Sequence, residues 1–462
     1  MADIETISPV DGRPLFTRAY ANPTQISQAL QRARSSRTAW RASSVRERSM
    51  FVTRAMDWLI ERTASVAEEI SRQIGRPITQ SPGELRGMAE RASYMIDVAA
   101  ASLADIDPGP KPGFRRYLRR EPLGTVLVIA PWNYPLLTAI NTIAPALIAG
   151  NTVILKHATQ TLLTAERLQQ AFDAAGLPEG VFQNVCLSHA DAANVIEDET
   201  IDFVAFTGSV QAGRIVQAAA SKRFIGVGLE LGGKDPAYIR ADADLARAVD
   251  TVVDGAMFNS GQSCCGIERA YVHTSCFDEF VHRAALLVRQ YRLGNPLDPT
   301  TTLGPMVKAA AATFVQGQID EAIGQGATAL IDPAGFEAQA LGPAYLAPQV
   351  LIDVDHRMRV MSEETFGPVL AVMPVHDDAE AVRLMNDSRY GLTAAVFTRD
   401  VEAVERIGSQ LDTGTVFLNR CDYIDPALAW TGVKDTGRGI SLSTLGYQQL
   451  TRVKSFHLKL PA

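Results

Sequence analysis

The chain has 462 residues, which is too long for a single small domain. Hydrophobic residues make up 47% of it, enough to form the cores of two large α/β domains. Lys and Arg total 44 against 51 Asp and Glu, and the net charge of -7 argues against a nucleic-acid binder. The N-terminus lacks an apolar signal segment, and no apolar run is long enough to span a bilayer. We therefore expect a cytoplasmic protein with neither nucleic-acid nor membrane partners.

Helical periodicity dominates the first part of the chain, from Pro23 to about Ile106, where apolar residues recur every three or four positions. A Pro- and Gly-rich stretch, 107–113, then introduces a basic segment, 114–120. We expect this segment to form an extended hairpin at a surface or a subunit contact. Its arginines are expected to be solvated charges rather than ligands.

Beyond Leu123 the chain alternates short apolar strands with longer helices, a pattern typical of βαβ units and a parallel sheet. The expected strands are 125–130, 152–156, 181–186 and 203–206, and the expected helices are 135–149, 161–175 and 209–220. A second alternating series, 235–419, predicts a second α/β domain. The end of the chain, 451–460, reads as an exposed strand, which favours pairing with a partner subunit.

Two adjacent cysteines, Cys264 and Cys265, lie in a glycine-flanked turn after a helical run over 242–258. The chain has five cysteines, an odd number without the spacing of metal ligands, so we expect no structural disulfide, zinc or other metal. A reactive thiol in this turn is one interpretation, and a pair of small buried hydrophobes is the other.

A candidate phosphate-binding turn lies at 205–213, although a GxGxxG fingerprint is missing from the first strand-helix turn. Gly208 would let the backbone approach a phosphate, and Ser209 would cap the following helix, whose amides favour an anion. An ordinary serine cap is the alternative. Lys156, at the end of an expected strand, would reach ribose or phosphate oxygens.

Seven motifs together resemble the aldehyde dehydrogenase superfamily. They are Pro131-Trp-Asn-Tyr-Pro-Leu136, Gly150-Asn-Thr-Val-Ile-Leu-Lys156, Phe206-Thr-Gly-Ser209, Leu229-Glu-Leu-Gly-Gly-Lys234, Gly261-Gln-Ser-Cys264, Glu364-Thr-Phe-Gly-Pro368 and Gly432-Val-Lys434 with Ser441 onward. The resemblance implies an α/β fold with a Rossmann-like cofactor-binding domain (1–106 and 123–232) and an α/β catalytic domain (233–440). It also implies a small oligomerisation or bridging element (107–122 and 441–462) and a homodimer or homotetramer.

The resemblance also assigns roles to individual residues. It makes Cys264 the nucleophile, Asn133 the oxyanion donor and Glu230 the general base, with NAD or NADP as the cofactor. The expected cofactor-binding residues are Pro131, Trp132, Lys156, His157, Thr159, Phe206, Gly208, Ser209, Leu231, Glu364 and Phe366. The candidate substrate-binding residues are Tyr134, Asn141, Ser263, Cys265, Arg420, Tyr423 and Ile424.

These roles fit the oxidation of an aldehyde to a carboxylic acid through a cysteine thiohemiacetal and a thioester. The oxyanion needs preorganised donors, and loss of one typically costs roughly 100- to 1000-fold in rate. The apolar surroundings of Glu230 would raise its pKa and suit it to activate water. The alternatives are a relative that passes the acyl group to coenzyme A and a catalytically silent binding or structural paralogue.

Two departures from the resemblance bear on selectivity. Thr159 stands where many relatives carry an acidic residue that binds the adenosine ribose, and His157 and Lys156 lie beside it, so the sequence favours NADP or dual use. The Lys-His-Ala variant also resembles bacterial semialdehyde dehydrogenases. Arg420 would recognise a substrate carboxylate, unless Asp422 neutralises it within the protein.

Overall fold

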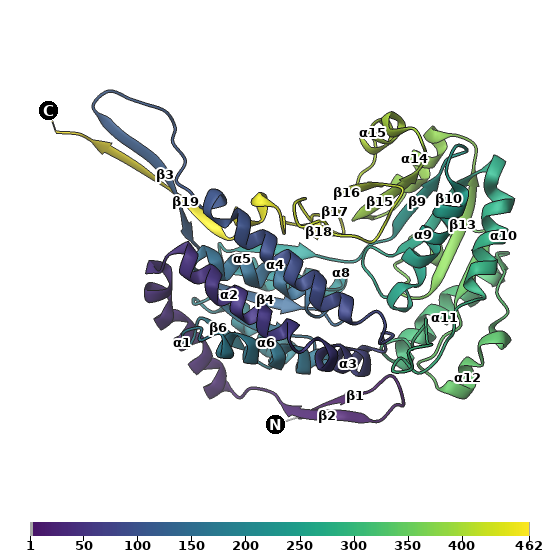
Figure 1. The fold of residues 1–462 in the computed structure, drawn as a ribbon, viewed down its shortest axis with the longest axis horizontal. Coiled ribbons are helices and arrows are strands. Elements are labelled where there is room, and N and C mark those ends of the chain that lie inside the picture. Colours follow the sequence, from purple (N-terminus) through teal and green to yellow (C-terminus); the bar gives the residue numbers. More distant parts are fainter. Residues whose placement is uncertain (1–2, 462) are drawn as a thin grey trace.

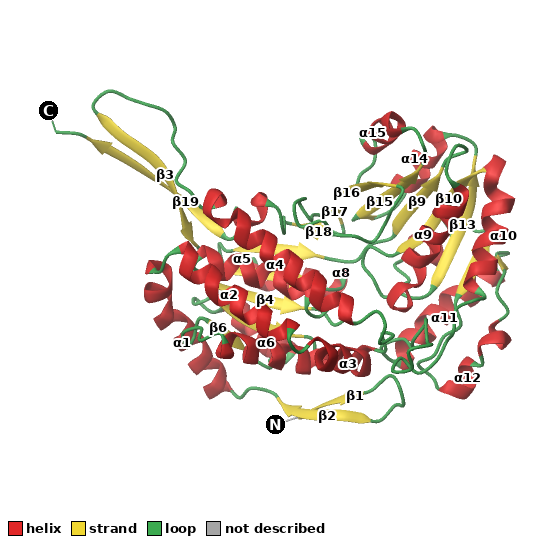
Figure 2. Ribbon diagram, viewed as in Figure 1, coloured by secondary structure: helices red, strands yellow, loops and turns green. Residues whose placement is uncertain are grey.

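The computed structural model describes residues 3–461, and its two main parts are each built around a mostly parallel sheet (Figures 1 and 2). A two-stranded ribbon projects from the first part, and a hairpin of β1 (Asp3–Ile7) and β2 (Pro14–Ala19) lies on the opposite side of that part (Figure 1). The predicted α/β class with parallel sheets is confirmed.

Six strands form the first sheet in the order β18-β8-β7-β4-β5-β6, with β18 alone antiparallel to its neighbour. They are β4 (Thr125–Ala130), β5 (Thr152–His157), β6 (Phe182–Asn184), β7 (Phe203–Thr207), β8 (Gly226–Glu230) and β18 (Gly437–Arg438). Every residue of β4 and β5 is buried, because helices cover both faces. The first sheet therefore includes a strand, β18, from the range 233–440, which the resemblance implies to be the catalytic domain.

Helices pack on both faces of the first sheet, with α2 to α6 on one face and α1, α7 and α8 on the other. Their bounds are α1 (Pro23–Ala42), α2 (Val45–Ile60), α3 (Thr63–Ile74), α4 (Pro82–Ser102), α5 (Leu137–Ala149), η1 (Thr159–Thr161), α6 (Leu162–Ala174), α7 (His189–Glu197) and α8 (Val210–Ala220). The helical pattern over 23–106 thus corresponds to four helices. A capping box, Ser44 with Glu47, starts the second of them.

The second sheet has the order β11-β12-β13-β10-β9-β15-β16. Its strands are β9 (Asp235–Ile239), β10 (Ile267–His273), β11 (Thr328–Ala329), β12 (Gln349–Ile352), β13 (Val369–Val375), β15 (Thr393–Phe397) and β16 (Thr415–Leu418), and β14 (Tyr390–Gly391) pairs separately with β17 (Val433–Lys434). The remaining helices are α9 (Leu245–Met257), η2 (Phe258–Gly261), η3 (Thr274–Cys276), α10 (Phe277–Val288), α11 (Ala309–Gly324), η4 (Pro333–Phe336), α12 (Ala338–Leu341), α13 (Arg359–Ser362), α14 (Asp378–Asn386), α15 (Val401–Gly408) and η5 (Thr444–Tyr447). The predicted second alternating series is therefore present.

The projecting ribbon joins β3 (Phe114–Pro122) to β19 (Thr451–Lys459) through nine antiparallel residue pairs. Rings stack across it, with Tyr117 on Phe456 at 4.5 Å and Phe114 on His457 at 4.7 Å. The last strand pairs on one edge with β3 of its own chain, and its expected pairing with a partner subunit stays a prediction. The same pairing replaces the expected hairpin at 114–120.

Among the helices of residues 3–461, none is both long and apolar enough to cross a membrane.

Candidate active site

Two cavities share a wall to which both Cys264 and Glu230 contribute. The first, about 490 Å³, is lined by α4, α5 and residues 421–424, and we call it the α4 cavity. The second, about 950 Å³, is lined by the carboxyl ends of β4, β5 and β7, the start of α8 and residues 363–366, and we call it the α8 cavity. A thiol and a carboxylate therefore stand where two ligands would meet.

Cys264 lies in the turn between η2 and β10 and is half-buried. Its carbonyl oxygen packs on Gly233, where an added Cβ would lie only 2.2 Å away, so the glycine is required for this approach. Among the described residues, no acceptor binds the backbone N–H of Cys264. This donor is therefore free to bind an oxyanion formed at the adjacent sulfur.

Asn133 is buried in the α8 cavity wall, and its side-chain Nδ2 donates to the carbonyl oxygen of Gln262 at 3.1 Å. Its own carbonyl accepts from Arg76 Nη2 and from Asn259 Nδ2. These contacts fix the asparagine from both ends. Because an amide nitrogen carries two hydrogens, one remains for a ligand.

Glu230 ends β8, and both of its carboxylate oxygens accept hydrogen bonds. Ser441 Oγ donates to Oε1, and Thr207 Oγ1 donates to Oε2 at 3.1 Å. Burial raises the pKa of Glu230 above its usual value, whereas these two hydroxyls and the charge of Arg91 pull it down. The net upward shift suits a group that takes a proton near neutral pH.

The start of α8 has the features of an anion site. Ser209 is the N-cap of this helix, and its side chain accepts from the N–H of Ala212 at 3.3 Å. Lys156, at the end of β5, and Thr159, just beyond it, line the same α8 cavity. The N–H of Gly208, however, already donates to the carbonyl of Glu230, so the phosphate donors would come from later amides.

Ten of the eleven predicted cofactor-binding residues line the α8 cavity; they are Pro131, Trp132, Lys156, Thr159, Phe206, Gly208, Ser209, Leu231, Glu364 and Phe366. The cavity thus combines a helix N-terminus, a lysine and aromatic surfaces. These features suit the phosphates, ribose and rings of a dinucleotide.

His157 is the exception, and its predicted contact with the cofactor was wrong. It is 2% exposed, and its Nε2 and Nδ1 lie 3.0 Å from the Pro135 carbonyl and from Thr161 Oγ1. Adjacent residues of a strand point to opposite faces, so His157 is directed away from the cavity that Lys156 lines. Burial lowers its pKa to about 4, and the ring is therefore neutral at neutral pH.

A buried ion pair holds the segment that carries Glu364 and Phe366. Glu268 pairs with Lys234 Nζ at 2.5 Å and also accepts from the N–H groups of Thr365 and Phe366. Phe366 has a φ of 53° and meets Trp132 edge-on, with the ring centroids 5.7 Å apart. Sequence reasoning had missed this ion pair.

Glu364 bridges this segment to the glycine pair after β8. Its Oε1 accepts from the N–H of Gly233 at 3.1 Å, and a Cβ added to Gly232 would lie 2.4 Å from its carboxylate. Burial raises the pKa of Glu364 to about 8, with the charge of Glu268 adding to the shift. The two glycines therefore bring Glu364 and the backbone of Cys264 close to β8.

Six of the seven predicted substrate residues line the α4 cavity; they are Tyr134, Asn141, Ser263, Cys265, Tyr423 and Ile424. Arg420 is not among the residues that line it. Its guanidinium is exposed and lies 3.9 Å from the centre of the Tyr423 ring, and its role in binding a carboxylate stays a prediction.

Cys265 differs sharply from Cys264. It is 4% exposed, and its thiol donates to Asp422 Oδ1 at 2.9 Å, an oxygen that also accepts from Ser263 Oγ. Its contact with Cys264, together with burial, holds the pKa of the Cys265 thiol well above its usual value. Burial raises the pKa of Asp422 to about 6. Of the two adjacent thiols, Cys264 is therefore better placed to act as a nucleophile.

Sequence reasoning also missed charged residues of α4. Glu84 forms a buried ion pair with Arg76 and accepts from the N–H of Leu136 at the start of α5. Arg91 lies two helical turns beyond Glu84, is 8% exposed and lines the α4 cavity. Their spacing of seven residues places both on one face of α4. This spacing is visible in the sequence and could have indicated that the two charges lie on the same side of the helix.

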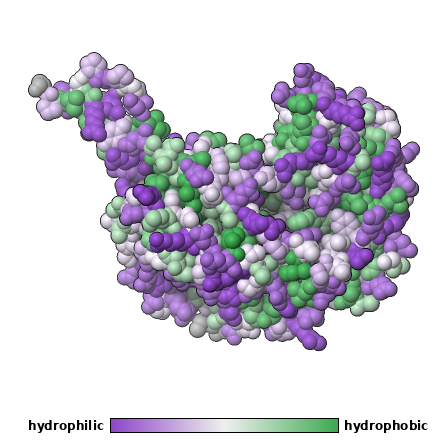
Figure 3. All heavy atoms as spheres, viewed as in Figure 1, coloured by the Kyte–Doolittle hydropathy of each residue, from purple (hydrophilic) through white to green (hydrophobic). Residues whose placement is uncertain are grey.

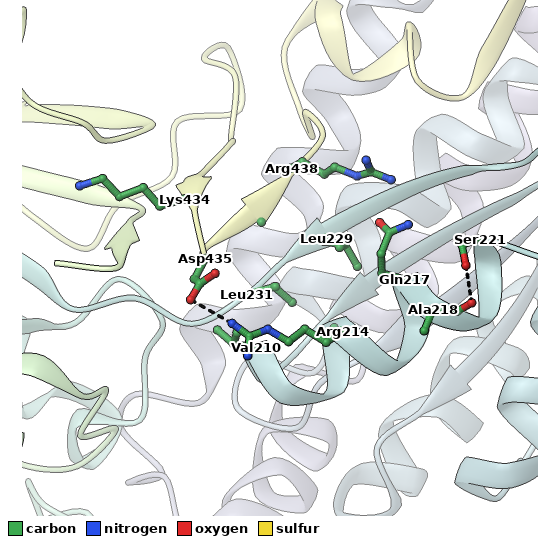
Figure 4. Close-up of a pocket in the computed structure, with 12 residues that line it drawn as sticks. Val210, Arg214, Gln217, Ala218, Ser221, Leu229, Leu231, Lys434, Asp435 and Arg438 are labelled. Atoms are coloured by element: carbon green, nitrogen blue, oxygen red, sulfur yellow. Dashed lines mark hydrogen bonds and ion pairs between the residues drawn. The ribbon is translucent and has the colours of Figure 1, made fainter.

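A third hollow, about 370 Å³, lies on the surface between α8 and β18 (Figure 4). Arg214 of α8 points across it to Asp435, at 3.2 Å, and Arg438 lies at its far side. Among the described residues that line this hollow there is no cysteine or histidine, and their single carboxylate is already paired. The candidate active site is therefore the wall shared by the other two cavities.

Comparisons with known proteins agree with this geometry. Residues 1–456 match the sequence model of the aldehyde dehydrogenase family. A succinate-semialdehyde dehydrogenase [NADP(+)] of Deinococcus radiodurans is 35% identical over 97% of this chain and 93% of its own length. A 4,4'-diapolycopene aldehyde oxidase of a Methylomonas species is 36% identical over 95% of this chain and 82% of its own length.

A solved structure gives the same result. The NADP-dependent glyceraldehyde-3-phosphate dehydrogenase of Bacillus halodurans, complexed with NADP, is 34% identical with a TM-score of 0.93 and covers 100% of this chain and 96% of its own. The names of the three proteins point to different substrates, although each is more than 30% identical to this chain over nearly its whole length. The chain therefore belongs to the aldehyde dehydrogenase family.

Proposed function

We propose that this protein oxidises an aldehyde to the carboxylic acid with NAD(P)⁺, through a thioester on Cys264. The observation that carries the proposal is the wall that Cys264 and Glu230 contribute to both cavities. The α8 cavity has the volume and the polar groups for a dinucleotide, and the α4 cavity has room for the aldehyde.

In the first half-reaction the Cys264 sulfur adds to the aldehyde carbon. Asn133 Nδ2–H and the Cys264 N–H, which both line the α8 cavity, bind the resulting oxyanion. When bound, NAD(P)⁺ supplies the hydride acceptor. Loss of hydride from the tetrahedral carbon leaves the acyl group on sulfur as a thioester.

In the second half-reaction Glu230 takes a proton from water, and the hydroxide attacks the thioester carbon and releases the acid. Its raised pKa makes it a stronger base than an exposed glutamate, and Thr207 and Ser441 hold its two oxygens. Cys264 leaves as a thiolate and is ready for another cycle.

The acceptor of the acyl group tests this function against its alternatives. We expect purified protein with an aldehyde panel and NADP⁺ or NAD⁺ to form the acid without coenzyme A. Product analysis with and without coenzyme A checks this, since a thioester product formed only in its presence would identify an acylating enzyme. Failure to reduce either nucleotide with every aldehyde would favour the silent paralogue.

We further propose that the protein uses NADP⁺ at least as well as NAD⁺. Lys156 lines the α8 cavity, and Thr159 provides no carboxylate to repel a 2′-phosphate. The neutral His157 contributes no charge to this preference. The NADP-dependent relatives named above are consistent with it.

Thr159→Glu should lower kcat/KM for NADP⁺ by at least about tenfold, because like charges a few Å apart repel by several kcal/mol inside a protein. In the matched control, Thr159→Gln, the glutamine side chain is nearly the same size as glutamate but carries no charge. Steady-state rates with both nucleotides measure the effect. A wild-type enzyme with a strong preference for NAD⁺ would contradict the proposal.

We also propose a homo-oligomer, a dimer or tetramer, in which a second copy covers the ribbon. The ribbon's surface is mostly hydrophilic (Figure 3), yet Val453, Leu458 and Leu460 are 55%, 42% and 49% exposed. Light scattering on the purified protein gives its mass in solution, and the mass of a single chain would contradict this assembly. The cytoplasmic location stays a prediction from the sequence.

A further inference from the structure

We propose that Arg91 binds a carboxylate carried by the substrate, so that this enzyme selects aldehydes with a second, anionic end. The inference rests on the proposed function, because it assigns the aldehyde to the α4 cavity. It goes beyond the reaction itself by naming a residue that chooses among aldehydes.

Arg91 projects from α4 into the wall of the cavity that also contains Cys264. The side chain is 8% exposed. Its Nη1 donates to the Leu137 carbonyl at 3.0 Å and to Asn141 Oδ1 at 3.1 Å, both on α5. These two bonds tie one side of the planar guanidinium to the protein and fix its orientation.

The other side of the guanidinium is free. Among the described residues no acceptor binds Nε or Nη2 of Arg91, no carboxylate lies within ion-pair distance, and both atoms remain accessible from the cavity. An arginine without an anionic partner is rarely buried to this extent, because the loss of hydration is costly. We therefore expect an anionic ligand to bind Nε and Nη2 of Arg91.

The same chain shows what this side of an arginine binds. Arg18 donates hydrogen bonds from Nε and Nη2 to the two carboxylate oxygens of Glu166, at 2.5 and 3.1 Å. Arg240 grips Asp378 in the same way, at 2.9 and 3.0 Å. The two parallel N–H groups match the two oxygens of a carboxylate. Arg91 leaves this same pair of donors open in the cavity that Cys264 also lines.

The other positively charged residues of the α4 cavity, Arg76 and Arg86, are not suited to bind the substrate carboxylate. Arg76 is engaged on every side, through its ion pair with Glu84 and its bonds to Asn259 and the Asn133 carbonyl. Arg86 is exposed to solvent, where an ion pair contributes little.

The anions of the cavity do not occupy Arg91 either. Glu90 is exposed and accepts from Tyr423 Oη, Asp422 accepts from Ser263 and Cys265, and Asp254 is exposed. Glu230 lies near enough for the Arg91 charge to act on its pKa, but both of its oxygens are held by hydroxyls. Arg91 is therefore the desolvated cation with an open donor pair.

The test compares two aldehydes of equal chain length, 4-oxobutanoate and butanal, and uses the ratio of their kcat/KM values. We expect the wild-type enzyme to favour 4-oxobutanoate, and Arg91→Met to lower the ratio by about 30-fold or more, the usual loss when a buried charge pair is broken. Arg86→Met, on the same helix but exposed, is the control and should change the ratio by less than about fivefold.

Arg91→Lys keeps the charge without the planar donor pair, so it should lower the ratio less than Arg91→Met does. If either variant is unstable, inhibition of the wild type gives the answer. Butanoate and succinate should then compete with 4-oxobutanoate, with succinate binding at least about tenfold tighter because its second carboxylate reaches Arg91.

Each contrary outcome is distinct. A wild type that oxidises butanal as well as 4-oxobutanoate would overturn the role of Arg91 and leave the proposed function standing. Equal slowing of both aldehydes by Arg91→Met, with a shifted pH profile, would mean that Arg91 acts only on Glu230. A wild type that oxidises no aldehyde would remove the proposed function itself.

Discussion

Cys264→Ser should abolish the burst of reduced nicotinamide and lower turnover by about 10⁴-fold or more, the order of loss when a hydrolase loses its nucleophile. A serine hydroxyl is a much weaker nucleophile than a thiolate, and no described histidine lines the α4 cavity to activate it. Rapid-mixing absorbance with saturating aldehyde and nucleotide measures the burst in a single turnover.

The neighbouring thiol provides the control. Cys265 is buried and donates to Asp422, and its pKa is held well above the usual value, so Cys265→Ser should retain the burst. The serine hydroxyl can keep the hydrogen bond to Asp422. A burst that survives in the Cys264 variant and disappears in the Cys265 variant would reverse the assignment of the nucleophile.

Glu230→Gln should retain the burst and then stall, lowering steady turnover by roughly 10²- to 10⁴-fold, the usual contribution of general-base catalysis. The amide cannot take a proton from water, so the thioester accumulates. Mass spectrometry of the intact protein would detect the acyl group on Cys264. An unchanged steady rate would exclude Glu230 as the base that hydrolyses the thioester.

The same residue sets a pH dependence. Glu230 acts only when ionised, so kcat should fall as the pH drops through its raised pKa. Ser441→Ala removes a hydrogen bond that favours the ionised form, so the pKa should rise further and the acid limb should move to higher pH. Profiles of kcat against pH for both proteins test this. A limb that stays in place would show that Ser441 does not tune the base.

The parallel sheets could be predicted from the sequence because their strands are buried on both faces. Beyond their first threonines β4 and β5 are apolar up to Lys156, and the helix between them, α5, ends at Gly150. The nucleophile turn and the glycine pair before Lys234 could be predicted only through the resemblance of their motifs to the family, and the structure adds the close backbone approaches that these glycines allow.

What could not be predicted depends on contacts between distant segments. The order of residues does not show that Arg91 would line the same cavity as Cys264, or that Ser441 would donate to Glu230 across more than two hundred residues. His157 was placed in the wrong cavity wall because the interpretation used its nearness to Lys156 and ignored the alternation of side chains along a strand. Arg420 stacks on a ring, a choice that depends on packing.

The glycine pair Gly232 and Gly233 links the nucleotide to the sulfur mechanically. The Glu364 carboxylate packs against Gly232, and the Cys264 carbonyl packs against Gly233. The segment that carries Glu364 and the turn that carries Cys264 therefore cannot move independently of each other. A nucleotide that binds against Glu364 should therefore change the reactivity of the Cys264 thiol. The rate at which iodoacetamide alkylates Cys264, measured with and without NADP⁺, tests this. The two ligands would then sense each other before any bond is made.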